Sequence, residues 1–466
     1  MGGGLLSGLN TALSALEAQQ SVISVTANNV ANVSTPGYSR EVADLQALPP
    51  ASPPSPGQSM AAGEYGTGVQ VSDIQRLNSR FLNLQQWGND TAVSGASAQS
   101  QTLGQVEAFF NEPSGTGLSS TLDAFWNGWQ SLSDQPTSTA ARSTLVAKGQ
   151  SLVSQFNALG SELSGLRQNL NEQVGQSVTQ INQLTSGIAA LNAQISSAVG
   201  SGLTPGSLQD ARSQMVDKLA QLVPVQVNWS GEDSMTVAVG GIDAVAGTQS
   251  QALQATPGSG GMLRLSWAGG GAATIQTGKL GALLHLRDQV IGGSGGYMAQ
   301  LDTMASQLIT AVNTQHAAGY DLQGNPGQAF FEGTSAESIA VNPALQTNPS
   351  LVAAAASAAG VPGDGSNALA VSQLQNKNLA GLGQNTVDQY YTTMVGQLGS
   401  ASRLAQNTVT NGQSLQQAIS NQQQQISGVS INGEMTKMVE AQNAYAAAAK
   451  VTVTINTMLG DLIQSV

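Results

Sequence analysis

The sequence predicts a mainly α-helical protein with a small antiparallel β module inserted between its helices. Apolar residues recur every three or four positions near both ends of the chain and in two long interior stretches, which is the period of an amphipathic helix. One central stretch instead alternates with period two, which is typical of strands. A chain of 466 residues also exceeds what one hydrophobic core usually holds, so we expect several domains.

The first predicted helix occupies the first thirty residues, where a heptad-like stripe is interrupted once by a polar residue, Gln20. The stripe stops at Asn32, and Ser34-Thr35-Pro36-Gly37 follows. Proline presets one turn angle and glycine permits a positive φ, so the helix is expected to end there in a tight turn. The stripe residues that we expect to contact other subunits are Leu6, Leu9, Leu13, Leu16, Ile23 and Val30.

The last predicted helix shows the same spacing and is expected to run to Val466. Apolar stripes at both ends of a chain need partners, because chain ends otherwise fray. The simplest partner of each stripe is the other, supplemented by neighbouring subunits. An isolated helix recovers little burial energy against its ordering entropy, so we expect both ends to be disordered before assembly. The expected contact residues here are Met438, Tyr445, Ile455, Leu459 and Leu462.

The interior is predicted to be a helical bundle that carries the β module. Helical seams cover residues 163–199 and 387–426, and strand-like alternation is confined to residues 223–278. The chain is therefore expected to run out and return, with both ends together. The expected divisions are a terminal coiled-coil domain (1–40 and 430–466), a connecting loop with short β structure (41–80), a helical bundle (81–203, 278–318 and 386–429), an inserted β domain (204–277) and a loop-rich excursion (319–385).

Composition excludes several classes of function. Only 9% of the residues are charged and the formal net charge is -12, without any cluster of lysine or arginine, so nucleic acid is not an expected partner. There is no cysteine, which excludes disulfides and thiolate metal sites. No apolar run approaches the length of a membrane span, and the first basic residue is Arg40, so we expect neither a membrane segment nor a cleaved signal peptide.

Several segments resemble one family of bacterial proteins. The segment ANNVANVSTPGYSR, residues 27–40, resembles the amino-terminal signature of flagellar rod, hook and hook-associated proteins, and residues 430–463 resemble their carboxy-terminal helix. The interior segments 181–195, 278–290 and 301–333 are similar to the hook-associated protein 1 family. The positions that match the signature turn are Asn28, Asn29, Asn32, Thr35, Pro36, Gly37 and Tyr38.

This resemblance implies a structural subunit of the hook-filament junction that assembles at the distal end of the hook through its terminal helices and is required for filament attachment. It implies an extracellular place in the flagellum, reached through the flagellar type III pathway without cleavage. The implied partners are further copies of the chain, the hook protein, the second junction protein and an export chaperone. No enzymatic activity, cofactor, nucleic acid or membrane is implied.

Three alternatives remain open at this point. A hook or distal rod protein shares both ends, and an export-apparatus effector or adhesin with coiled-coil stalks has a similar pattern. A secreted hydrolase is the third, because Gly292–Gly296 fits the G-x-S-x-G pattern around Ser294, with His316 downstream. That pattern needs a buried strand before the serine, whereas a helical run precedes it here. His285 and His316 are also too few for a typical zinc site.

Overall fold

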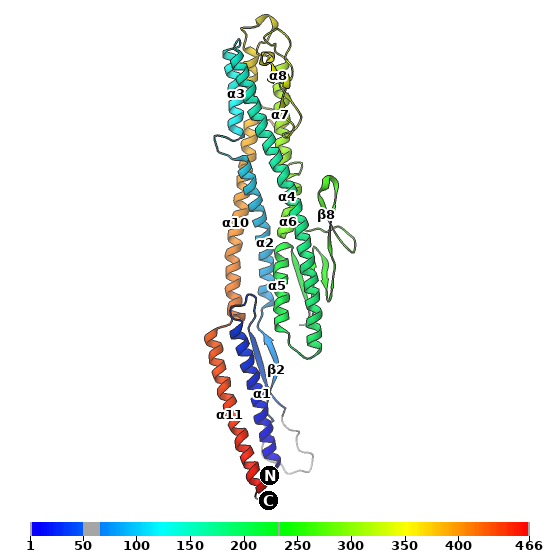
Figure 1. Ribbon diagram of the computed structural model, residues 1–466, viewed down its shortest axis with the longest axis vertical. Coiled ribbons are helices and arrows are strands. Elements are labelled where there is room, and N and C mark those ends of the chain that lie inside the picture. Colours follow the sequence, from blue (N-terminus) through cyan, green and yellow to red (C-terminus); the bar gives the residue numbers. More distant parts are fainter. Residues whose placement is uncertain (1, 50–65, 232–233, 465–466) are drawn as a thin grey trace.

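The computed structural model describes residues 2–49, 66–231 and 234–464. The molecule is a long rod of helices, and both termini lie at the same end (Figure 1). The predicted fold class, mainly α with an inserted antiparallel β module, is confirmed. In the described part of the chain, no helix is both long enough and apolar enough for a membrane span.

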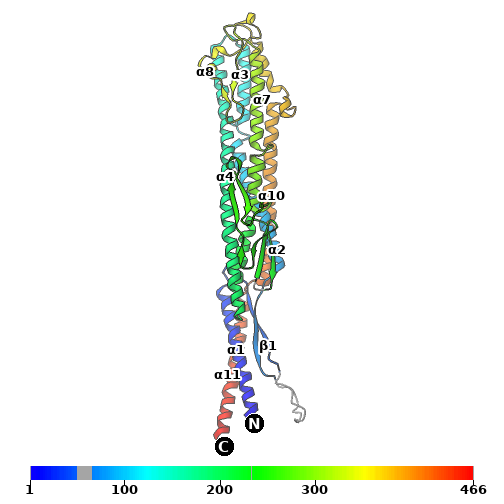
Figure 2. The ribbon, with the colours of Figure 1, turned by 90° about the vertical axis from the view of Figure 1, so that its right-hand side faces the viewer.

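One end of the rod is a pair of helices, α1 (Gly2–Ala31) and α11 (Ile431–Gln464). The two helices lie side by side and run antiparallel (Figure 1). A two-stranded antiparallel ribbon of β1 (Glu41–Ala47) and β2 (Val69–Arg76) lies along α1 (Figure 2). The predicted end of the first helix near residue 31 is confirmed, whereas the last two residues of the second predicted helix lie outside the described residues.

The rest of the rod, the shaft, is built from long helices. Several of these helices begin at a residue whose side chain accepts a hydrogen bond from a backbone N–H group of the first helical turn. Ser79 caps α2, Ser138 caps α4, and Thr386 forms a capping box with Gln389 at the start of α10. The shaft helices are α2 (Arg80–Phe110), α3 (Leu118–Asp134), α4 (Thr139–Gly200), α5 (Gly206–Leu222), α6 (Gly278–His285), continued by a π-helical turn (Leu286–Ile291), α7 (Tyr297–Ala317) and α10 (Val387–Ser427).

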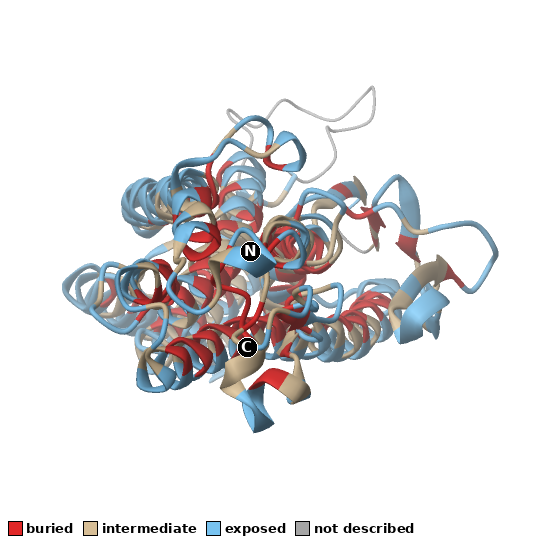
Figure 3. Ribbon diagram, turned by 90° about the horizontal axis from the view of Figure 1, so that it is seen from above, coloured by how far each residue is buried: buried red, intermediate tan, exposed pale blue. Residues whose placement is uncertain are grey.

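The buried sides of the shaft helices face one another along the rod axis (Figure 3). At the end farthest from the termini, the core is a cluster of fully buried aromatic side chains, with ring centroids 4.9 to 6.2 Å apart. Such clusters contribute both apolar burial and favourable ring geometry. The cluster consists of Phe125, Trp126, Trp129, Phe330 and Phe331.

Residues between α7 and α10 cover this end with short elements and many turns. The side chains of Asn313 and Asn342 hold the segment in place, because their amides bond the backbone of residues 329–331. The elements are β9 (Phe331–Glu332), β10 (Ala340–Val341), α8 (Pro343–Thr347), α9 (Ser366–Ser372) and the 3-10 turns Pro349–Leu351, Ala358–Gly360, Gln373–Asn376 and Ala380–Leu382.

The β module projects from the side of the shaft next to α4 (Figure 1). It has a four-stranded antiparallel sheet and a separate two-stranded hairpin. The predicted boundary at residue 204 is too early, because residues 206–222 form α5, whose buried face packs on α2 and α4. The strands are β3 (Val225–Ser230), β4 (Ser234–Val239), β5 (Ile242–Ala246), β6 (Gln249–Ser250), β7 (Leu253–Pro257) and β8 (Leu263–Trp267), with a 3-10 turn at Ser259–Gly261.

Three asparagines of α4 attach the module to the shaft. Asn182 donates to Leu253 O and accepts from Leu253 N, both at 2.8 Å, so its amide replaces a strand partner. Asn192 donates to the carbonyls of Met235 and Gly247, and Asn171 accepts from Leu263 N. The three lie about three helical turns apart, so they follow one side of α4.

We expect Asn182→Ala to loosen the β7-β8 hairpin while the shaft stays folded. The substitution removes both bonds to Leu253, and each unmet buried backbone group costs about 1 to 3 kcal/mol. Hydrogen exchange should therefore speed up in β7 and β8 and stay unchanged in α4. Asn169→Ala, at an exposed position of the same helix, is the control. Unchanged exchange in the hairpin of the Asn182 variant would show that this residue is not its anchor.

Candidate assembly site at the terminal helices

The signature residues gather where the terminal pair meets the shaft. After α1, Tyr38 N donates to Thr35 O, and Gly37 between them has φ 76°, so the predicted turn and the need for glycine are confirmed. A side chain at Gly37 would also collide with Gln214 of α5. Three stretches of chain cross this region, which we call the joint: residues 32–40, 76–80 and 427–431.

Asn29 is the centre of the joint. Its buried side chain donates to Glu41 O at 2.8 Å and to Glu434 Oε2 at 2.9 Å, and its oxygen accepts from Tyr38 OH and Glu41 N. One side chain of α1 therefore binds the ribbon, the turn and α11 together. By contrast, Asn28 is exposed; it donates a long bond to Glu41 Oε2 at 3.4 Å and accepts one from Asn32 Nδ2 at 2.8 Å.

Ion pairs complete the joint. Glu434 is only 2% exposed, and Arg40 donates to its second oxygen at 2.7 Å. The backbone N–H of Arg40 also donates to Ser427 O at the end of α10. On the shaft side, Asp210 of α5 accepts from Ser39 N at 2.9 Å and pairs with Arg76 of the ribbon. All three crossing segments are thus fixed to each other or to the shaft.

Burial raises the pKa of two groups in the joint. Burial and the nearby carboxylates of Glu41, Asp210 and Glu434 raise the pKa of Tyr38 to about 12, so its hydroxyl stays a hydrogen-bond donor. Burial also raises the pKa of Glu41, and the bond from Asn28 opposes that effect. The joint is therefore a fixed polar clamp, which we call the joint clamp: Asn29, Tyr38, Arg40, Glu41 and Glu434.

At two positions the contact between α1 and α11 is made by residues outside the predicted leucine stripe. A Cβ at Gly8 would lie 3.2 Å from Ile455 Cδ1, and Asn29 meets Glu434 at the other end of the pair. The side toward α11 therefore passes through small residues such as Ala12, which allow close approach of the two helices. Bulky leucines would hold the two backbones farther apart.

The predicted leucine stripe of α1 lies about a quarter turn away from that contact, since residues follow at about 100° around a helix. Leu6 is 55% and Leu13 50% exposed. Leu9, Leu16, Ile23 and Val30 are half-buried. The ribbon contacts α1 on the side away from the leucine stripe, where the hydroxyl of Ser14 accepts a hydrogen bond from Val69 N. The leucine stripe is thus partly uncovered in the single molecule, most of all at Leu6 and Leu13.

On α11, the predicted residue Ile455 faces α1, since a Cβ at Gly8 would lie 3.2 Å from its Cδ1. Ile455 is buried, and Met438, Leu459 and Leu462 are half-buried, whereas Tyr445 remains 40% exposed. A second apolar stripe, which sequence reasoning missed, lies a quarter turn round α11 and is about half exposed. This outer stripe consists of Met435, Val439 and Val453.

The two uncovered stripes lie on the same side of the pair. On each helix, the stripe lies about a quarter turn from the line of contact between the two helices, in the direction in which the residue numbers rise. Because α11 runs antiparallel to α1, this rotation leads to the same side of the pair on both helices. The side so formed, the terminal apolar face, carries no charged side chain at its stripe positions. Exposed apolar side chains on one side of the helix pair make this face a candidate interaction site.

A groove opens on the other side of the pair, between the ribbon and α11. It has a volume of about 320 Å³. Its lining includes the apolar residues Val22 and Val25 of α1 and Ala441 and Ala444 of α11, and the polar residues Gln19, Thr26 and Glu434. We call it the terminal groove; its rim carries Glu41, Lys437 and Glu440.

Geometry does not support the hydrolase alternative. Ser294 is exposed just before α7, whereas His316 lies near the far end of that helix of 21 residues, about 30 Å away. His316 is fully buried, its Nδ1 bonds the carbonyl of Gln328, and its Nε2 accepts from Ala353 N. Nowhere in residues 2–49, 66–231 and 234–464 do three or more His, Asp or Glu side chains group so as to hold a metal ion.

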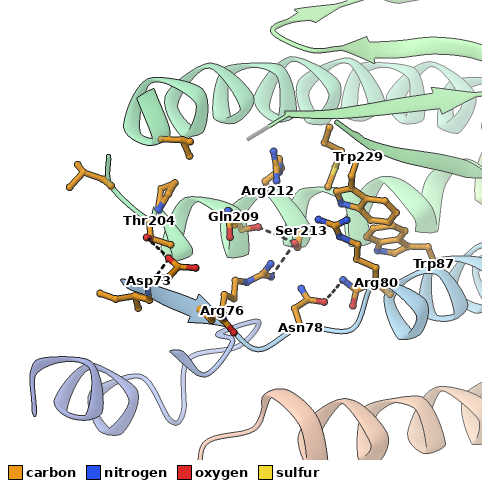
Figure 4. A pocket seen from close by; sticks show the side chains of 17 residues that line it. Asp73, Arg76, Asn78, Arg80, Trp87, Thr204, Gln209, Arg212, Ser213 and Trp229 are labelled. Atoms are coloured by element: carbon orange, nitrogen blue, oxygen red, sulfur yellow. Dashed lines mark hydrogen bonds between the residues drawn. The ribbon is translucent and has the colours of Figure 1, made fainter. Parts of the chain in front are cut away.

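A pocket of about 470 Å³ lies between the ribbon, α2, α5 and the β module (Figure 4). Its side chains contact one another: Trp87 and Trp229 stack with centroids 6.1 Å apart, and Arg80 lies 5.2 Å over the Trp229 ring. Arg76 donates to Ser213 at the back of the pocket (Figure 4). These contacts tie the ribbon and β module to the shaft.

The buried histidine should make stability fall in mild acid. Burial lowers the pKa of His316 to about 4 from 6.5, so the unfolded chain binds more protons than the native protein between those values. Stability is therefore full above pH 6.5 and is lost as the pH falls toward 4, by roughly 3 kcal/mol. Urea unfolding at several pH values measures this loss.

His316→Gln should flatten that dependence, because glutamine can keep one donor and one acceptor without titrating. Asp90, whose pKa burial and Asp217 raise to about 6, acts in the opposite direction in both proteins, so their difference isolates His316. His285→Gln, at an exposed position, is the control and should keep the wild-type dependence. If the His316 variant does the same, its ring is not the group that titrates.

Comparison with known proteins identifies the family. Residues 103–331 match the model of the flagellar hook-associated protein FlgK helical domain. The chain is 31% identical to flagellar hook-associated protein 1 of Bacillus subtilis, and the match covers 98% of this chain and 97% of that protein. The chain belongs to the flagellar hook-associated protein 1 family. Flagellar hook-associated protein 1 of Salmonella typhimurium is 26% identical over 98% of this chain and 99% of its own length.

Both ends match models shared with other flagellar proteins. Residues 9–38 match the flagella basal body rod protein model, and residues 420–465 match the flagellar basal body rod FlgEFG protein C-terminal model. The structure of the hook junction protein FlgK of Burkholderia pseudomallei has a TM-score of 0.65 at 20% identity, covering 74% of this chain and all of that one. This likeness shows that the two proteins share a fold.

Three members of the joint clamp were missed as site residues: Arg40, Glu41 and Glu434. No local pattern joins Arg40 to Glu434, because they are far apart in the sequence. Arg40 stands at the end of the signature segment and was the first basic residue of the chain. Glu434 is an acidic residue in the first turn of α11, where a carboxylate is usually solvated. Only the antiparallel pairing of the two ends brings them together.

Proposed function

We propose that this chain is a structural subunit of the bacterial flagellum that forms the hook-filament junction and assembles at the distal end of the hook. The observation that carries this proposal is the terminal pair: both ends of a hook-associated protein 1 family member form one antiparallel pair with an uncovered apolar face. An apolar face at the end of a rod-shaped subunit suits side-by-side packing around an axis. A hook or distal rod role is not favoured, because the interior matches the hook-associated family rather than only the shared ends.

The assembly residues that we propose are the leucine stripe of α1 and the predicted residues of α11. The stripe residues of α1 are available for contacts between subunits, whereas the predicted residues of α11 hold the terminal pair together. The signature residues from Asn28 to Tyr38 act through the joint: they fix the direction in which the terminal pair leaves the shaft.

The proposed partners are further copies of this chain, the hook protein, the second junction protein and an export chaperone. The chain is inferred to reach the outside of the cell through the flagellar type III pathway without cleavage. An uncovered apolar stripe before assembly gives a chaperone a physical reason to bind the carboxy-terminal helix. The role needs no catalysis and no cofactor, in agreement with the distance between Ser294 and His316.

Deletion of the gene tests the function directly. Electron microscopy of the deletion strain should show hooks without filaments, with flagellin released into the medium, and the intact gene on a plasmid should restore filaments. A Ser294→Ala copy should restore them equally well. Filaments on the hooks of the deletion strain would overturn the proposed function, and a defect confined to Ser294→Ala would favour the hydrolase.

A further inference from the structure

A short segment passes through the core at the tip of the shaft, the end farthest from the termini (Figure 1). It consists of residues 352–355, one valine and three alanines, and we call it the latch. Each latch residue is at most 3% exposed. In the described part of the chain the latch forms one β-bridge, between Ala355 and Tyr320. Its first two residues are instead held by side chains.

Three helices each contribute one buried side chain that bonds the latch backbone. Arg142 of α4 donates to Val352 O. His316 Nε2 of α7 accepts from Ala353 N, and Asn367 Nδ2 of α9 donates to Ala353 O, both at 2.8 Å. Since a buried backbone group without a partner is unfavourable, the latch stays closed only while these three side chains keep their roles.

His316 can accept a hydrogen bond from the latch only while its ring is neutral. Its other nitrogen, Nδ1, lies against the carbonyl oxygen of Gln328, which can only accept, so the proton of the neutral ring is on Nδ1. The lone pair of Nε2 is then available to the N–H of Ala353. A second proton on the ring would be on Nε2 and would face that N–H, so two donors would oppose each other.

We propose that protonation of His316 at Nε2 releases the latch, so that mild acid opens the tip of the rod while the long helices stay folded. One proton joins the ring, the N–H of Ala353 bonds water instead, and no covalent bond of the chain changes. The opening is local for two reasons. Leaving the core exposes mainly alanine methyl groups, and residues 356–365, which follow the latch, are already exposed or half-buried.

The groups around the ring oppose a positive charge on it in the closed tip. From α4, the guanidinium of Arg142 acts on His316 as a like charge, and the buried carboxylate of Asp321 acts on Arg142. The other neighbours of the ring are uncharged: Trp129 of α3 and Phe330 lie with ring centroids 5.8 and 5.7 Å from it. The amide that α9 contributes is also uncharged.

The size of the effect follows from the two states of the ring. Burial, with a smaller effect of Arg142, lowers the pKa of His316 to about 4 from 6.5, against the opposing effect of the Gln328 bond. Once the latch leaves, the ring meets water and its pKa returns toward 6.5. As the pH falls between these values, opening of the latch therefore becomes about tenfold easier per pH unit.

Thiol labelling of the purified monomer tests the latch, because the chain has no cysteine of its own. Val352→Cys places a smaller side chain at a fully buried latch position, Ala305→Cys reports opening of the shaft core, and Ser151→Cys is an exposed reference. Each variant reacts with 4,4′-dithiodipyridine, which labels thiols in acid, and each rate is divided by that of Ser151→Cys at the same pH. We expect the Val352→Cys ratio to rise roughly twentyfold from about pH 7 to about pH 5. It should exceed the Ala305→Cys ratio at every pH, and His316→Gln should abolish its rise.

Equal ratios for Val352→Cys and Ala305→Cys would overturn the proposal, because the latch would then open only together with the shaft. A ratio that does not change with pH, or a rise that persists in His316→Gln, would overturn it as well. If Val352→Cys does not fold, hydrogen exchange of the unmodified chain replaces it: protection of residues 349–365, corrected for the intrinsic exchange rate, should fall with pH and stay below that of α4. These measurements use the monomer, so their outcome is independent of the proposed role at the junction.

Discussion

Replacing Leu13, Leu16 and Ile23 together by glutamine is expected to abolish filament attachment while the shaft stays folded. The three side chains lie on the half-exposed stripe, away from the α1 side that faces α11, and glutamine keeps a good helix propensity. In the assembly, each apolar side chain that becomes buried contributes about 1.5 to 3 kcal/mol. Losing three of them lowers the affinity between subunits roughly a thousandfold or more.

The variant is measured by motility and by counting filaments on hooks after complementation of the deletion strain. The matched control carries three substitutions on the polar side of the same helix: Asn10→Gln, Glu17→Gln and Ser24→Gln. It should retain filaments, because these side chains are exposed and outside the stripe. Filaments at normal frequency in the leucine variant would show that the stripe does not carry assembly.

Asn29→Ala is expected to release the terminal pair from the shaft without unfolding the shaft. The substitution removes two donated and two accepted hydrogen bonds, and it leaves the Glu41 backbone N–H and part of the Glu434 carboxylate without their partner. Unmet buried groups cost about 1 to 3 kcal/mol each, so opening of the joint should become easier by roughly 3 to 5 kcal/mol. Hydrogen exchange should speed up in α1, α11 and the ribbon, and stay unchanged in α4.

Asn28→Ala is the matched control for this prediction. The side chain of the neighbouring asparagine is exposed, and its two bonds, to Glu41 and from Asn32, are open to water, so their loss should change exchange only slightly. If the two variants behave alike, the joint is held by the helix contacts and the Arg40-Glu434 ion pair rather than by Asn29. Equal protection in the Asn29 variant and the native protein would contradict the role of the joint clamp.

The long helices were predictable because their periodicity is strong and their ends carry clear signals. The stripe that ends at Asn32 and the Pro36-Gly37 turn predicted the end of α1, and the structure confirms both. The β module was also predictable, since the alternation around Val237 and Leu265 differs from a helical period. Residues 206–222, which form α5, were predicted to belong to the inserted β domain, because no separate helix was predicted for them.

The site was only partly predictable from the sequence. A heptad stripe shows which side of a helix is apolar, but not which of two apolar sides meets a given neighbour. On α1 the small residues around Gly8 allow the closest approach, so α11 packs there and the leucines stay outside. The second stripe of α11 and the joint clamp depend on contacts between the two ends of the chain, which no local spacing reveals.

That the terminal helices become ordered only on assembly stays a prediction. Both are helical over residues 2–31 and 431–464, and the joint clamp holds their ends next to the shaft. The side of α1 that includes Gly8 and Asn29 carries small and polar residues such as Ala12 and Thr26, so few large apolar side chains are buried there. Low stability of this pair in the single molecule is therefore expected, with the neighbouring copies supplying the missing burial.

Thiol labelling of a single cysteine at Val439 tests the central claim most directly. This position is on the outer stripe of α11 and is 52% exposed in the single molecule. Ala305→Cys, in the buried core, and Ser151→Cys, exposed on the shaft, are reference positions. We predict rapid labelling of Val439→Cys in the purified monomer and strong protection in isolated hook-junction assemblies. Equal labelling rates in the two states, or protection already in the monomer, would contradict the claim that assembly covers this face.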